Sequence, residues 1–155
     1  MIIGHLPAGY LLAKALRRPF DEDPVIFWGI TAGAAAPDFD MLWFLFVDGG
    51  TVHHHTYITH DPTIWLGVLV LGMILARRSL IGLGIGAVFH LMLDTIVGTI
   101  EWGYGRLSFS GPLVEVPEAQ SHWVLNCLLH WTFAVEIAIT LSALGLLWWS
   151  MRTRG

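Results

Sequence analysis

The sequence predicts an all-α integral membrane protein, a single domain over residues 1–155 built as a bundle of about five apolar helices. Hydrophobic residues make up 55% of the chain and charged residues only 13%, whereas soluble domains carry about 25% charged residues. A chain this short has a large surface for its volume, so few charges leave much of that surface apolar. The eight tryptophans also favour a bilayer, because the indole ring suits the membrane interface.

Each expected helix is an apolar stretch with charged or helix-breaking residues at its ends. Asp23 followed by Pro24 is a typical helix start, and the glycines of LIGLGIGA suit close helix packing in lipid. Stretches shorter than the roughly 20 residues that span a bilayer would need tilt, flanking residues or local thinning; the alternative is a set of buried helices in a soluble bundle. The segments run from Ile2 to Leu16, Pro24 to Ala36, Thr63 to Ala76, Ser79 to about Ile100 and Trp123 to Trp149, with a short apolar stretch from Met41 to Val47.

Basic residues mark one set of segment ends. The positive-inside rule places those ends in the cytoplasm, which gives an external N-terminus, five crossings and a cytoplasmic C-terminus. Arg106 alone departs from this pattern, in a polar loop from about Glu101 to His122 that we expect to be the largest external feature. The basic residues at the expected cytoplasmic ends are Lys14, Arg17, Arg18, Arg77, Arg78, Arg152 and Arg154.

Charge and cysteine content exclude some functions. The formal net charge is −4 and there is no basic tract, which argues against duplex nucleic acid as a partner. The single cysteine, Cys127, cannot form an intramolecular disulfide. The basic residues near the N-terminus follow the apolar stretch, the reverse of a cleavable signal peptide.

Histidines and aspartates gather on the side opposite the arginines. His90 and Asp94 share one helix face, and in an apolar helix they are costly unless paired, metal-bound or facing a cavity. Pro37 disfavours helix just before it, so we expect a turn that aims Asp38 and Asp40. Imidazole and carboxylate groups bind Zn²⁺ and similar ions, and so many ligands favour two or three divalent ions, zinc being the expected metal. The predicted ligands are His5, Asp38, Asp40, His55, His60, His90 and Asp94.

Taken singly, these residues also have structural explanations as caps, solvated turns or internal hydrogen bonds. A histidine at a helix start, such as His5, is often a capping residue, and His90 and Asp94 can bond to each other. Glu136 lies deep in the last segment and needs a partner or a proton, so it is a candidate for a group behind a ligand. Four histidines are weaker candidates: His53, His54, His122 and His130.

An ordered set of short motifs carries a family resemblance. GHLPAG, PDFD, HTYITH and HLMLD follow one another between His5 and Asp94. This set resembles the YdjM-like, LexA-regulated membrane-bound metal-dependent hydrolases. That family's middle motif has an arginine and a serine where this chain has Thr56 and Asp61. The resemblance implies a hydrolase in a prokaryotic inner or plasma membrane.

The order His, Asp, His, His-x-x-x-Asp is more distantly similar to the zinc-dependent phospholipase C and single-strand nuclease superfamily, although the C-terminal His-x-x-x-Glu or His-x-x-x-Asp motif of those enzymes is absent. That likeness implies a zinc cluster that cleaves phosphoesters. We therefore expect hydrolysis of a phosphoester in a lipid or lipid-linked substrate by a metal-activated water, at the extracytoplasmic end of the bundle. Asp38 or Asp40 is the expected general base, if it is not a ligand.

Two other functions remain open from the sequence. One is a metal-binding membrane protein without catalysis, such as a transporter or sensor, in which intramembrane histidines and aspartates form an ion path. Its ligands should lie near the middle of the bilayer, with polar groups continuing toward the cytoplasm. The other is a structural bundle whose polar residues only pair with one another.

Overall fold

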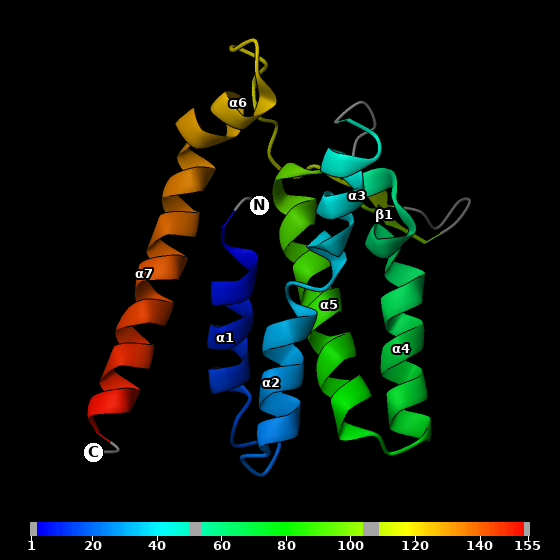
Figure 1. The fold of residues 1–155 in the computed structure, drawn as a ribbon, viewed down its shortest axis with the longest axis vertical. Helices are drawn as coiled ribbons and strands as arrows, with labels where there is room; N and C mark the ends of the chain where they lie inside the picture. Colours follow the sequence, from blue (N-terminus) through cyan, green and yellow to red (C-terminus); the bar gives the residue numbers. More distant parts are fainter. Residues whose placement is uncertain (1–2, 50–53, 104–108, 154–155) are drawn as a thin grey trace.

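The computed structural model describes residues 3–49, 54–103 and 109–153, which form a bundle of helices (Figure 1). The prediction of a mainly helical chain is confirmed. A short antiparallel ribbon of β1 (Glu101–Trp102) and β2 (Phe109–Ser110) lies in the expected external loop, on either side of residues that are not described, Arg106 among them. The α-helices are α1 (His5–Ala15), α2 (Pro24–Gly33), α3 (Asp40–Phe46), α4 (Pro62–Ile74), α5 (Arg78–Val97), α6 (Trp123–Leu129) and α7 (Trp131–Arg152), and the 3-10 turns are η1 (Pro37–Phe39), η2 (His54–Thr56) and η3 (Ile58–His60).

Two helices begin at an aspartate followed by a proline, as predicted for α2. Asp23 accepts a hydrogen bond from the Val25 backbone N–H at 2.7 Å, and Asp61 accepts one from Thr63 at 2.8 Å. Proline at the first helical position loses no intrahelical bond, and the carboxylate satisfies an N–H group that the helix leaves free. The start of α4 is thereby fixed two residues after His60.

Helix α5 is the centre of the bundle and packs between α2 and α4 (Figure 1). Glycines allow the backbone of α5 to lie close to α2 and α4. A Cβ added at Gly86 would lie 2.1 Å from the Ile30 carbonyl oxygen of α2, and one added at Gly84 would lie 2.7 Å from Leu69 Cβ of α4. The glycine-rich segment is thus used for close helix contact on two faces, as small residues are in membrane bundles.

The second expected segment, Pro24 to Ala36, ends earlier than predicted. Helix α2 ends at Gly33, and Pro37 opens the η1 turn, after which the chain continues into α3 (Figure 1). Ala36 keeps helical dihedrals (φ −64°, ψ −40°), and the chain tightens into turns before the proline, where Ala35 N bonds Ala32 O and Ala36 N bonds Gly33 O. The interruption places two aspartates, Asp38 and Asp40, in and just after a turn next to α5.

Helix length separates the five expected crossings into two groups. Helices α5 and α7, of 20 and 22 residues, are long and apolar enough to cross a membrane. Helices α2 and α4 are apolar but only 10 and 13 residues long, and α1 has 11. The last expected segment is two helices, because His130 is extended (φ −84°, ψ 148°) and separates α6 from α7.

The outer helix α7 lies against α1 at one edge and exposes most of its apolar side chains (Figure 1). Leu141 and Trp149 are each 63% exposed, and within α7 only Glu136 and Ala143 are buried. Apolar surface on this scale marks contact with a membrane or another protein.

The bundle has two chemically different ends. The last turn of α1, the α4–α5 connection and the end of α7 lie at the lower end in Figure 1, and these segments carry the basic residues. The core toward that end is apolar and contains Ala13, Ile26 and Ile30. The start of α1, the η1 turn and the start of α4 lie away from that end, below α3 and α6 in Figure 1, and these segments carry or adjoin the predicted ligands.

Candidate metal centre

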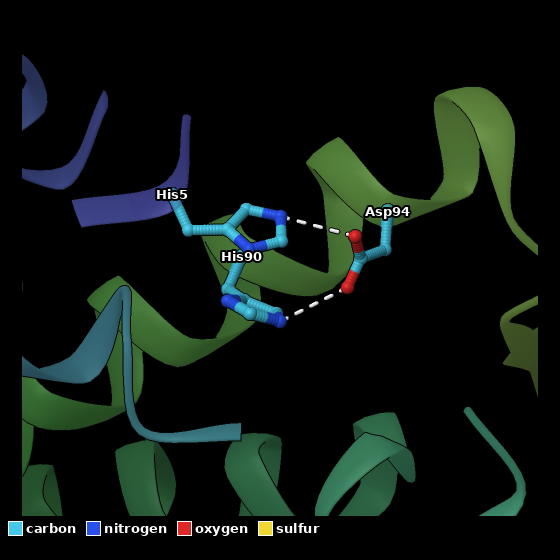
Figure 2. A group of neighbouring side chains, drawn as sticks. All are labelled: His5, His90 and Asp94. Carbon is cyan, nitrogen blue, oxygen red and sulfur yellow. Dashed lines mark ion pairs between the residues drawn. The ribbon is translucent and has the colours of Figure 1, made fainter. Parts of the chain in front are cut away.

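Asp94 is the centre of the polar cluster. It lies near the C-terminal end of α5 and its side chain is 1% exposed. Its Oδ1 atom is 3.0 Å from Nε2 of His5, and its Oδ2 atom is 2.9 Å from Nε2 of His90 (Figure 2). Nε2 of His60 and of His55 lie 3.6 and 3.7 Å from the same Oδ2 atom. One carboxylate thus faces four imidazoles from four separate segments.

His5, the first residue of α1, and His90 of α5 approach Asp94 from the same side (Figure 2). Their ring centroids are 3.7 Å apart. Their buried Nε2 atoms lie 3.0 and 2.9 Å from the two oxygens of the carboxylate. Imidazole nitrogens and carboxylate oxygens that converge in a buried space are a donor set that fits a bound divalent cation.

The opposite nitrogen of each of three imidazoles is held by another group. Nδ1 of His90 lies 2.8 Å from the Ala34 carbonyl oxygen, and Nδ1 of His60 lies 2.7 Å from Asp40 Oδ2. Nδ1 of His5 lies 3.0 Å from Asp38 Oδ2. Metal-binding histidines almost always bond a carbonyl or carboxylate through the nitrogen that does not bind metal, which fixes the ring and its tautomer. All three rings therefore present Nε2 to the same space.

Three overlapping sets of ligand atoms surround that space. Within each set the atoms lie within 4.8 Å of one another, and Asp94, His60 and His90 each belong to two sets. Ligands of one tetrahedral zinc ion, at about 2.0–2.1 Å from the metal, are separated by about 3.3 Å, which is close to the observed spacings. Shared ligands suit neighbouring ions. The sets are His5, His90 and Asp94; Asp38, His60 and His90; and His55, His60 and Asp94.

The two aspartates that flank Phe39 have different positions. Asp38 Oδ1 lies 3.6 Å from Nε2 of His90 and 3.9 Å from Nε2 of His60, and the Asp38 side chain is 32% exposed. Asp40 belongs to none of the three ligand sets among the described residues; it bonds the rear nitrogen of His60 and accepts a hydrogen bond from Thr59. The η1 turn therefore places Asp38 in front of the cluster and Asp40 behind it. Asp40 was predicted to be a ligand, and here it orients the predicted ligand His60.

The neighbouring carboxylates raise the pKa of His60. Burial lowers this pKa, but hydrogen bonds to Asp40 and Asp94 and their charges outweigh burial and raise it to about 9. The site of His60 therefore favours a positive charge, which a bound cation can supply in place of the proton.

A pocket of about 490 Å³ opens beside the cluster and reaches His55 and His60. The turns η2 and η3 form one wall, and the segment after α5 forms another. Its remaining described lining carries two carboxylates and neutral residues, with neither lysine nor arginine among them: Thr56, Tyr57, Ile58, Asp61, Pro62, Thr99, Glu101 and Gly103.

Of the weaker candidates, His122 and His130 have partners outside this cluster. His122 accepts a hydrogen bond from Val124 N at the start of α6, and Nδ1 of His130 lies 2.9 Å from Thr132 Oγ1. His53 lies outside the described residues, and His54 is described only through its backbone in η2. Glu136 is buried and bonds the backbone that leads into α1, a partner that spacing along the sequence does not reveal.

Comparison with protein-family models, with curated proteins and with solved structures finds no significant match to this chain.

Proposed function

We propose that the chain is a membrane-bound metal-dependent hydrolase in which the cluster binds two or three zinc ions and cleaves a phosphoester. One observation carries this proposal: three imidazoles, each anchored through Nδ1, turn Nε2 toward the same buried carboxylate, Asp94. The three overlapping ligand sets favour more than one ion. The ordered motifs that resemble the YdjM-like hydrolases support the same activity.

We further propose that the chain is integral to a prokaryotic inner or plasma membrane, with the cluster at the extracytoplasmic end and the C-terminus in the cytoplasm. The long apolar helices α5 and α7 and the exposed apolar side chains of α7 support bilayer insertion. The basic residues at the opposite end support the orientation, because cytoplasmic loops carry more lysine and arginine. Helices α1, α2 and α4 would complete five crossings, with α3 extending the broken second one.

The chemistry follows from the positions of the side chains. Bound divalent ions would polarise a phosphoryl group and lower the pKa of a water molecule. Of the two carboxylates in the ligand sets, Asp38 is the more exposed, so it would serve as the base for that water where it does not itself bind metal. Metal ions held by the cluster would neutralise the phosphate. An apolar bundle beside the pocket suits a lipid or lipid-linked phosphoester.

The distribution of polar residues favours an enzyme over a transporter. A transport path needs polar groups that continue through the bundle toward the other side. In the described part of the chain, the core below the cluster is formed by apolar residues such as Ala13, Ile26 and Ile30. Thr31 of α2 is also buried, but its hydroxyl donates a hydrogen bond to the Phe27 carbonyl of its own helix. The cluster is thus closed toward the basic end.

The test is hydrolysis of lipid phosphoesters by the purified full chain in liposomes. The zinc-loaded protein is given phospholipids and polyprenyl phosphates, and the released phosphate or headgroup is measured. We expect turnover that chelation abolishes and zinc restores. Asp94→Asn should lose both zinc and turnover, whereas Asp21→Asn, an equivalent change near the basic end, should keep both.

Two results would contradict the proposal at different points. Wild-type protein that binds zinc but cleaves none of these substrates would exclude the phosphoesterase activity and favour a metal sensor. Wild-type protein that binds no zinc, manganese, nickel or iron would exclude the metal centre itself.

A further inference from the structure

Glu136 is a buried acid in a helix that is otherwise largely exposed. It is 4% exposed, although neighbouring Val135 and Ile137 are 45% and 42% exposed. Its Oε2 atom accepts hydrogen bonds from the backbone N–H groups of Ile3 at 2.8 Å and Gly4 at 3.1 Å. These two residues immediately precede α1, so a side chain of the last helix reaches the beginning of the first.

Helix α1 has no side-chain cap of its own. Gly4 occupies the N-cap position and no capping side chain from its own segment bonds the first turn. The first N–H groups of a helix have no intrahelical acceptor, and a carboxylate at that end also interacts favourably with the helix dipole. Glu136 supplies an acceptor to the N–H of the N-cap residue Gly4 and to that of Ile3 just before it, from a helix more than 130 residues away in the sequence.

The capped end is the end that carries a metal ligand. His5 directly follows Gly4, and its two ring nitrogens each lie 3.0 Å from a carboxylate, Asp38 on one side and Asp94 on the other. The middle of α1 is located separately, where Gly9 packs so closely on Ala34, the C-terminal cap residue of α2, that a Cβ would lie 2.3 Å from the alanine methyl. The contact with α2 fixes the position of α1 as a whole, and the contact with α7 fixes the position of its N-terminal end.

We propose that Glu136 is a positioning residue that holds His5 in the metal centre and so couples the docking of α7 to metal affinity. This inference rests on the proposed metal centre. It predicts a specific pattern: loss of the Glu136 carboxylate loosens residues 3–5 and weakens metal binding through His5 alone, leaving the ligands from α5 and the turns in place.

The experiment compares Glu136→Leu, which removes both acceptor oxygens, with Glu136→Gln, which keeps one. Ser142→Ala is the control, because Ser142 is exposed on the same helix and its hydroxyl bonds only the Ala138 carbonyl. In metal-free protein, hydrogen exchange of the N-terminal peptide should be at least about tenfold faster in the leucine variant. Cobalt affinity, measured by absorption, should fall about 10–100-fold, as for other groups that orient a ligand. The glutamine variant should recover most of both, and Ser142→Ala should match the wild type.

The double variant His5→Ala/Glu136→Leu distinguishes positioning from general damage. If Glu136 acts through His5, the leucine change adds no further loss of cobalt affinity once His5 is gone. An equal loss with and without His5 would overturn the inference, as would full cobalt affinity in Glu136→Leu alone. Failure of the wild type to bind cobalt would instead count against the metal centre, and unchanged exchange of the N-terminal peptide in the leucine variant would then overturn the cap itself.

Discussion

Substitution of Gly86 by alanine should weaken metal binding, because it disturbs the close contact between α5 and α2. Gly86 lies in α5 one turn before His90 and faces α2. The added Cβ would lie 2.1 Å from the Ile30 carbonyl oxygen and 2.7 Å from Ala34 N, and both are backbone atoms that cannot rotate away. Ordinary contact begins at 3.4 Å, so the two helices must separate locally by about 1.3 Å.

The structure gives the size of the effect. Overpacking a close interface costs about 1–3 kcal/mol, which lowers the Tm of a chain of this size by roughly 3–10 °C. The same separation acts on the hydrogen bond between Nδ1 of His90 and the Ala34 carbonyl, which is 2.8 Å long and would move beyond the roughly 3.2 Å reach of such a bond. Loss of a group that orients a ligand should weaken zinc binding about 10–100-fold.

The assay is thermal unfolding and zinc titration of Gly86→Ala in detergent, beside Gly67→Ala in α4. A Cβ at Gly67 meets no atom within 4 Å, so alanine there should be neutral or stabilise the helix by about 0.5–1 kcal/mol. Wild-type stability and zinc affinity in Gly86→Ala would refute the claim that helix contact at this glycine sets the position of His90.

Three further predictions address the centre itself. Zinc at a concentration of 100 Kd should stabilise the protein by about 2.7 kcal/mol, so chelation should lower Tm in a scanning fluorescence measurement; a Tm indifferent to chelator would contradict a bound ion in the folded state. Asp40→Asn should reduce zinc affinity about 10–100-fold in competition with a chromophoric chelator, because the carboxylate fixes the His60 ring; wild-type affinity would show that Asp40 does not orient it. Gly98→Ala would place a Cβ 2.3 Å from Cε1 of His55, so the zinc content after dialysis should fall with α5 still folded; an unchanged content would show that His55 is not a ligand.

The sequence predicted which residues meet because topology and residue type act together. Apolar segments with basic residues at one set of ends must alternate in direction, which brings the other ends to one level. Six of the seven predicted ligands belong to the three ligand sets there, and the seventh, Asp40, bonds His60. Asp94 and His90 face inward because they share one face of the central helix. The turn at Pro37 was also predicted, but α2 ends three residues before Ala36, and Ala36 itself keeps helical dihedrals.

Topology and residue type do not predict which of two neighbouring polar residues faces the cluster and which one supports it from behind. Asp38 and Asp40 are both acids in a turn, and only the path of η1 decides which one faces the cluster and which one bonds the rear of His60. Glu136 has no ligand-like spacing, since its partners are backbone N–H groups at the other end of the chain. Helix lengths also depend on where packing and turns end each apolar segment, so that two helices rather than five have the length of a crossing.

The central claim is that His5, His60, His90 and Asp94 enclose bound metal. An anomalous-scattering map of the zinc-loaded protein, recorded at the zinc absorption edge, tests it most directly. We predict two or three peaks among these side chains, at about 2.0–2.1 Å from Nε2 atoms and carboxylate oxygens. A map without a peak between Asp94 and the surrounding imidazoles would contradict the account.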